Sequence, residues 1–126
     1  MVGQMGRDGV HADLISLGIE GDISAYFGLL AAGRTSEAAR LADAIVRFGW
    51  DPVQRRMKTG AGASDYATAL DVSGSWGVMF LRSRRMAREA LDSQGYAASV
   101  LRVTSFDGSI EGYGDIAGPY TVSVEF

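Results

Sequence analysis

The spacing of apolar residues changes partway along the chain, and this change constrains the fold more than any other feature. The last seven residues, 120–126, alternate large apolar and polar side chains, which is typical of a half-buried strand. Residues 35–49 instead repeat apolar side chains every three or four positions, which is typical of a helix with one buried face. The chain therefore predicts an α+β fold, with a helical N-terminal half packed on a small antiparallel sheet that carries one helix.

The length of 126 residues fits a single domain. We expect a flexible arm over residues 1–9, a helical half over 10–60 and a sheet half over 65–126. The small residues from Thr59 to Ser64 mark the boundary between the halves. The sequence shows no internal repeat.

The first half predicts helices over residues 10–17 and 23–32, and a third helix that is capped by Thr35 or Ser36 and ends at Gly49. Asp22 is a suitable N-cap for the second of these helices, and Gly33 is placed to end it. Asp51-Pro52 predicts the start of a further short helix, because proline suits the first helical turn.

The second half predicts the order β-β-α-β-β-β. Residues 66–82 fit either a strand hairpin or one long helix, and the glycines and β-branched residues there favour strands. A helix over 84–94 should end at Gly95. Strands over 97–106 and 109–113 should flank a tight Asp107-Gly108 turn, and a final strand should follow over 120–126.

Composition excludes several kinds of chemistry. The chain has no cysteine, and His11 is its only histidine, so disulfides, thiolate nucleophiles, zinc–cysteine sites and histidine-dependent triads are not expected. We predict no cofactor and no metal. The longest nearly apolar stretch, residues 23–32, is about half of the ~20 residues that a membrane helix needs. We therefore expect a soluble protein of the host cytoplasm or of a virion, with no membrane contact.

Four residues form the sharpest local candidate site: Ser83, Arg84, Arg85 and Arg88. If Ser83 caps a helix, the arginines lie at its positive end, and a bound anion or an acidic partner would relieve the unfavourable charge. The alternative is internal pairing through Arg85–Glu89 and Arg88–Asp92, which are four residues apart.

A second candidate is a protein interface on the helical half, made by Tyr26, Phe27 and Leu30. These large side chains exceed what one buried helix face requires. Acidic residues without basic ones follow Val103, which separates positive from negative charge in the second half.

These features favour a non-catalytic protein that acts by binding a protein partner or a second copy of itself. A bacteriophage component or accessory factor fits, either a virion subunit or a small inhibitor of a host complex. The alternative is a nucleic-acid-binding accessory protein that contacts phosphates through Arg55, Arg56, Lys58 and the Arg84 cluster. The net charge of −3 does not favour this alternative.

Overall fold

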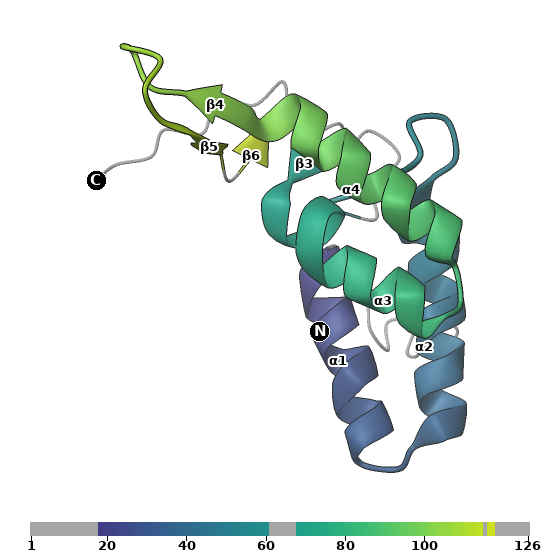
Figure 1. The fold of residues 1–126 in the computed structure, drawn as a ribbon. Coiled ribbons are helices and arrows are strands. Elements are labelled where there is room, and N and C mark those ends of the chain that lie inside the picture. Colours follow the sequence, from purple (N-terminus) through teal and green to yellow (C-terminus); the bar gives the residue numbers. More distant parts are fainter. Residues whose placement is uncertain (1–17, 61–67, 115, 118–126) are drawn as a thin grey trace.

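The computed structural model describes residues 18–60, 68–114 and 116–117, and these residues form an α+β fold (Figure 1). Helices make up most of the described chain, and short antiparallel strand pairs lie at their ends. The elements are, in chain order, α1 Ile19–Ala31, α2 Thr35–Gly49, β1 Trp50–Asp51, β2 Arg56–Met57, β3 Thr68–Ala69, the π-helix η1 Leu70–Trp76, α3 Gly77–Ser83, α4 Ala87–Leu101, β4 Arg102–Thr104, β5 Glu111–Tyr113 and β6 Ile116–Ala117.

The helices form two hairpins that turn in the same way. The turn after α1 contains Gly33, which has a φ of 75°, and the next amide, of Arg34, donates to the Leu29 carbonyl at 2.9 Å. The turn after α3 contains Arg85, which has a φ of 61°, and the Met86 amide likewise donates to the Leu81 carbonyl at 2.9 Å. This six-residue closure around a left-handed residue is the Schellman motif. Each turn is followed by a helix of 15 residues, α2 or α4.

Strand pairing extends the correspondence between the two halves. Helix α2 leads into the β1–β2 hairpin, and α4 leads into the β4–β5 hairpin. We call residues 18–60 the first unit and the described residues from 68 to 117 the second unit. In each unit the first and last segments pair with each other. Gly18 bridges Gly60 in the first unit, and β3 pairs with β6 in the second. The described chain thus repeats one order of elements, although the sequence shows no internal repeat.

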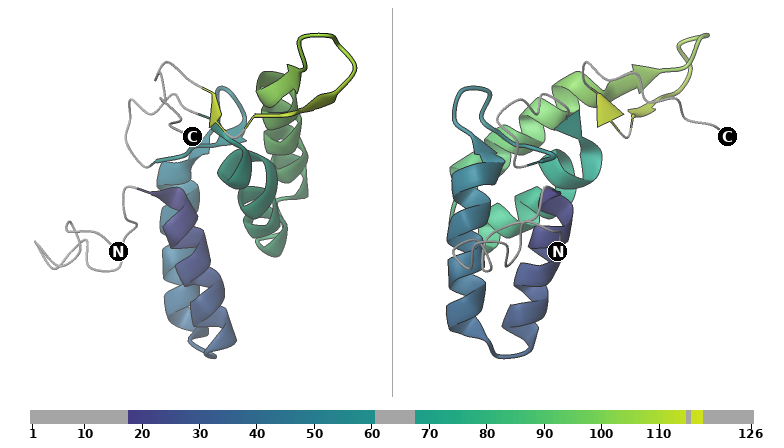
Figure 2. Two further views of the ribbon diagram at one scale, coloured as in Figure 1. Left: turned by 90° about the vertical axis from the view of Figure 1, so that its left-hand side faces the viewer. Right: turned by 180° about the vertical axis from the view of Figure 1, so that it is seen from behind.

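The core lies where the two helical hairpins meet (Figure 2). The ring of Tyr26 on α1 packs edge-on against Phe80 on α3, with ring centroids 5.1 Å apart. Alanines on the second helix of each hairpin, Ala38 and Ala90, are almost completely buried, so the helices approach closely. The helical half therefore packs mainly on other helices, and not on a sheet as the sequence predicted.

A buried hydrogen-bond chain joins β2, η1 and α4. The Met57 amide donates to Ser93 Oγ at 3.0 Å, Ser93 Oγ donates to the Ser73 carbonyl at 2.6 Å, and Ser73 Oγ donates to the Met57 carbonyl at 2.6 Å. Both serines are fully buried. Because unpaired buried polar groups are costly, this closed set of partners fixes the first unit against the second.

Residues 70–83 are helical, so the preferred hairpin over residues 66–82 is wrong, and among the described residues of that segment, 68–82, only β3 is a strand. Val72, Gly77, Phe80 and Leu81 are buried, and their spacing places one side of the η1–α3 segment against the core. Burial on a helical face outweighs the weak helix propensity of the glycines, because propensity amounts to only about 1 kcal/mol for each glycine.

Three further boundaries differ from expectation. Helix α4 covers Ala87–Leu101 and passes through Gly95, so Gly95 does not end it and most of the predicted strand over 97–106 is helix. The second half is therefore not β-β-α-β-β-β. The expected short helix after Asp51 is instead the turn of the β1–β2 hairpin, where Asp51 Oδ1 accepts from the Val53 amide at 2.9 Å.

The predicted stop at Gly33, the hairpin around Asp107-Gly108 and the positive φ of Gly108, 75°, are confirmed. The connection is wider than the tight turn that was predicted, because β4 ends at Thr104 and β5 begins at Glu111. The proposed arm over 1–9, the helix over 10–17 and the final strand over 120–126 lie outside the described residues.

Candidate functional site: an apolar groove between the helical hairpins

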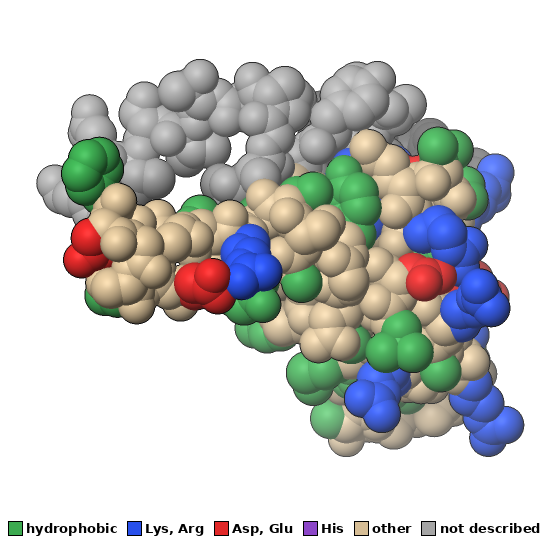
Figure 3. All heavy atoms as spheres, turned by 45° about the horizontal axis from the view of Figure 1, so that its top comes forward, with side chains coloured by type: hydrophobic (Ala, Val, Ile, Leu, Met, Phe, Trp, Pro, Cys, Tyr) green, Lys and Arg blue, Asp and Glu red, His purple; other side chains and the backbone are tan. Residues whose placement is uncertain are grey.

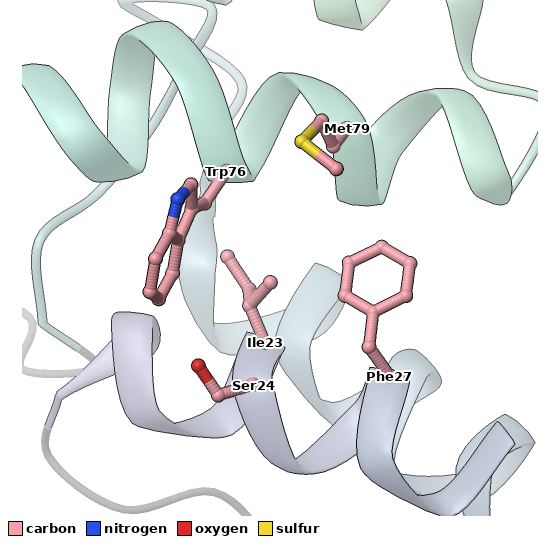
Figure 4. Close-up of a pocket in the computed structure, with 5 residues that line it drawn as sticks. All are labelled: Ile23, Ser24, Phe27, Trp76 and Met79. Carbon is pink, nitrogen blue, oxygen red and sulfur yellow. The ribbon is translucent and has the colours of Figure 1, made fainter. Parts of the chain in front are cut away.

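An apolar pocket opens between α1 and the η1–α3 segment, and we call it the α1–α3 groove (Figure 4). Its volume is about 370 Å³, which falls in the range of about 300–1,000 Å³ that is usual for ligand pockets. It is lined by Ile23, Ser24, Phe27, Trp76 and Met79.

Helical spacing brings these side chains together. Ile23 and Phe27 are four residues apart on α1, and Trp76 and Met79 are three apart where η1 continues into α3. Pairs at these spacings lie on the same helix face. Figure 4 shows the two pairs projecting toward each other from opposite helices, with Ile23 between Trp76 and Phe27.

The groove combines a buried floor with exposed walls. Ile23 is 1% exposed, whereas Trp76 is 42% exposed and Met79 is 59% exposed. A methionine side chain is flexible and adapts to different apolar surfaces, and tryptophan is enriched at protein interfaces. These walls are suited to contact an apolar side chain that enters from solvent.

Among the described residues, the groove lining carries no acid, base or charged side chain, and Ser24 supplies its one hydroxyl. A nucleophilic serine requires a neighbouring base, which this lining lacks. The arrangement is chemically suited to binding through apolar contact.

The three predicted interface residues lie in different places. Phe27 lines the groove and Leu30, on the next turn of α1, is 38% exposed. Tyr26 belongs to the core instead, because it is only 3% exposed and its hydroxyl lies 3.0 Å from Ser83 Oγ. Sequence reasoning missed Trp76 and Met79 as groove residues, although the helical alternative for residues 66–82 would have placed them on one face.

Ser83 does not cap a helix, which corrects the basis of the predicted anion site. Ser83 is the last residue of α3, and its Oγ donates to the Phe80 carbonyl at 2.6 Å. The amides of Arg84, Arg85 and Met86 donate to carbonyls at the end of α3, so they do not point at a ligand. The backbone amides that were expected to bind an anion together with the arginines therefore donate their hydrogen bonds within the turn.

The arginines of this segment, which we call the arginine turn (Arg82, Arg84, Arg85 and Arg88), differ in their environments. Arg84 is half-buried and pairs with Asp43 on α2 at 3.3 Å, whereas the other three are exposed. Asp92, the expected partner of Arg88, instead pairs with Arg55 at 2.6 Å. Surface pairs of this kind contribute about 0–1 kcal/mol each, so Arg84–Asp43 is a weak link between the hairpins.

Two of the arginines assigned to phosphates by the nucleic-acid alternative, Arg55 and Arg56, make contacts within the chain. Arg56 is completely buried, with its Nε donating to Gln54 Oε1 at 2.9 Å and its guanidinium 5.6 Å from the centre of the Tyr96 ring. Arg55 pairs with Asp92 and lies 5.8 Å from the Trp50 ring centre. A buried guanidinium cannot reach a phosphate backbone, so this observation does not favour the alternative.

Over residues 18–60, 68–114 and 116–117, no group of three or more histidine or acidic side chains is placed to hold a metal ion. In the same ranges, no helix has both the length and the apolar character needed to cross a membrane. Among known proteins, the chain matches no family model, no curated protein and no solved structure.

Proposed function

We propose that this chain is a non-catalytic binding protein whose α1–α3 groove accepts an apolar side chain of a protein partner. The observation that carries the proposal is the open groove itself, with exposed Trp76 and Met79 facing Phe27 over a buried floor. Protein interfaces commonly depend on a few aromatic or aliphatic anchors that fill such pockets. A bacteriophage component, as a virion subunit or an inhibitor of a host complex, is the setting that the sequence favours for this activity.

Peptide selection tests the proposal, because a random-peptide display library samples many apolar anchors at once. The library would be selected on the wild-type protein and then counter-selected on Met79→Glu, which places a charge in the groove wall. We expect enriched peptides that carry aromatic or aliphatic anchors and that lose affinity at least tenfold for Met79→Glu. Fluorescence of Trp76, measured in a Trp50→Phe background, should change when they bind.

Leu91→Glu is the matched control. Leu91 is an apolar helical residue on α4 that is 69% exposed, comparable with Met79, and it lies outside the groove. Peptides should bind Leu91→Glu as they bind the wild type. Enrichment of no peptide, or equal binding to wild type and Met79→Glu, would contradict the proposed function.

A further inference from the structure

The β4–β5 hairpin projects from the end of α4 and carries several exposed apolar side chains. Figures 1 and 2 agree that this hairpin extends beyond the body of helices. Phe106 at its tip is fully exposed, and Ile110 is 68% exposed. Val103 and Tyr113, on the paired strands, are at least half exposed. Several exposed apolar side chains gathered on one projecting hairpin are typical of an interaction site.

Hydrogen bonds hold the tip in one conformation. Asp107 Oδ1 accepts from Ser105 Oγ and Ser109 Oγ, both at 2.7 Å, and from the Ser109 amide at 3.0 Å. The Ser105 amide donates to the Ile110 carbonyl at 2.8 Å, and the Ile110 amide donates to Ser105 Oγ at 3.0 Å. Phe106 is therefore presented by a pre-ordered loop, which lowers the entropy lost on binding.

We propose that the α1–α3 groove of one molecule receives the Phe106 tip of a second copy of this chain. This inference rests on the proposed function and names the partner. A cavity of ~150 Å³ is enough to hold benzene, so a groove of about 370 Å³ has room for the phenyl ring of Phe106 and part of Ile110. Phe27 and Trp76 offer edge-to-face contacts to the ring, and Met79 offers a sulfur–aromatic contact.

The Asp107 tip and the α3 side of the groove carry opposite charges, whereas Glu20 lies four residues before Ser24 on the α1 side. Asp107 follows Phe106 directly, and its bonds to Ser109 and Ser105 lower its pKa to about 2, so it is ionised at neutral pH. Arg82 follows Met79 by three residues in α3, about 4.5 Å along the helix axis, and it is exposed on the side toward α4, beside Val78 and Ala90. When Phe106 enters beside Met79, Asp107 comes within reach of exposed Arg82. Figure 3 shows acidic side chains on the projecting hairpin and most of the basic side chains on the opposite side of the view.

The two surfaces lie on separate parts of the chain, so their contact joins molecules head to tail. The groove is between α1 and α3, whereas the tip is at the far end of the hairpin that follows α4. A contact between two different surfaces leaves a free tip at one end and a free groove at the other, and it generates chains or closed rings. Within the predicted settings, self-assembly of this kind favours a virion subunit over an inhibitor.

Sedimentation velocity of the full chain from micromolar to millimolar concentration tests this proposal. Wild type should show concentration-dependent association, and both Phe106→Ser and Met79→Glu should remain monomeric. The two variants mixed in equal amounts should form a dimer and nothing larger, because one supplies an intact groove and the other an intact tip. Arg82→Gln should weaken association severalfold and flatten its dependence on salt.

Matched controls separate this contact from a general loss of solubility or folding. Val53→Ser removes an 89% exposed apolar side chain from the other strand hairpin, and Leu91→Glu matches Met79→Glu; both should associate like wild type. Circular dichroism should show each variant to be folded. A monomeric wild type, association of Phe106→Ser, or failure of the mixture to dimerise would overturn the inference. The proposed function would survive any of these results if selected peptides still require Met79.

Discussion

Replacing Gly77 with alanine should destabilise the protein, although Gly77 lies at the start of helix α3, where alanine is normally favoured. A Cβ atom at Gly77 would overlap the carbonyl oxygen of Val72 in the preceding π-helix, and it would lie only 3.0 Å from Met57 Cγ. The side chain of Met57 can move, but the Val72 carbonyl belongs to the backbone of a buried segment. The π-helical turn between Val72 and Gly77 must therefore widen to admit a methyl group.

The magnitude follows from two opposing terms. Alanine gains ~1 kcal/mol over glycine in a helix interior, whereas overpacking a buried site costs ~1–3 kcal/mol. Because a backbone atom blocks the methyl group here, we expect a cost near the upper end and a net loss of ~2 kcal/mol. An unfolding entropy of about 2.1 cal/mol/K per residue makes 1 kcal/mol equivalent to about 4 °C in a chain of 126 residues. The melting temperature should thus fall by about 8 °C.

Gly95→Ala in α4 is the matched control, because a Cβ at Gly95 would meet no atom within 4 Å. The same substitution should there raise the melting temperature by about 4 °C through helix propensity alone. Thermal unfolding followed by circular dichroism measures both shifts. Equal or higher stability of Gly77→Ala would refute the reasoning, since it would mean that no backbone atom blocks that position.

Two further predictions concern the turns. Both Arg85 and Gly33 have positive φ, which favours glycine. Arg85→Gly should therefore raise the melting temperature and Gly33→Ala should lower it, each by an amount that corresponds to ~1 kcal/mol. Melting temperatures that shift in the same direction for both variants would contradict this. Asp107 has a folded-state pKa of about 2 against an ordinary value of 3.8, so the ionised carboxylate stabilises the hairpin tip at higher pH and this contribution is lost as pH falls through about 2. An NMR titration of the Ser109 amide should therefore have its midpoint near pH 2, and a midpoint near 4 would show that the three bonds to Asp107 are absent.

Local patterns in the sequence were enough to predict several elements. The apolar spacing of residues 35–49 predicts α2 and its end at Gly49, because one strongly amphipathic face favours a helix whatever it packs against. Gly33 and Gly108 mark turns because a left-handed backbone conformation favours glycine regardless of distant contacts. The overall α+β class follows from the presence of both kinds of pattern.

Tertiary contacts decided the elements whose local signals conflict. In residues 70–83, glycines and β-branched residues favour strands, but Val72 and Phe80 gain more by burial on one helical face against the other hairpin. Gly95 remains within α4 because the helix continues to Leu101, which is almost fully buried. Propensity differences of about 1 kcal/mol per residue are smaller than the burial of a large apolar side chain, which contributes ~1.5–3 kcal/mol.

The candidate site depends still more on tertiary structure. Tyr26 and Phe27 are adjacent and similar in sequence, yet one packs against Phe80 in the core and the other lines the groove, because neighbouring residues on a helix point about 100° apart. The opposite wall comes from Trp76 and Met79, some fifty residues away in the sequence. Sequence by itself determined which local segments favour helix, turn or strand. Only the packing of the two helical hairpins decided which apolar side chains are buried and which are exposed at the groove, because burial depends on partners that are distant along the chain.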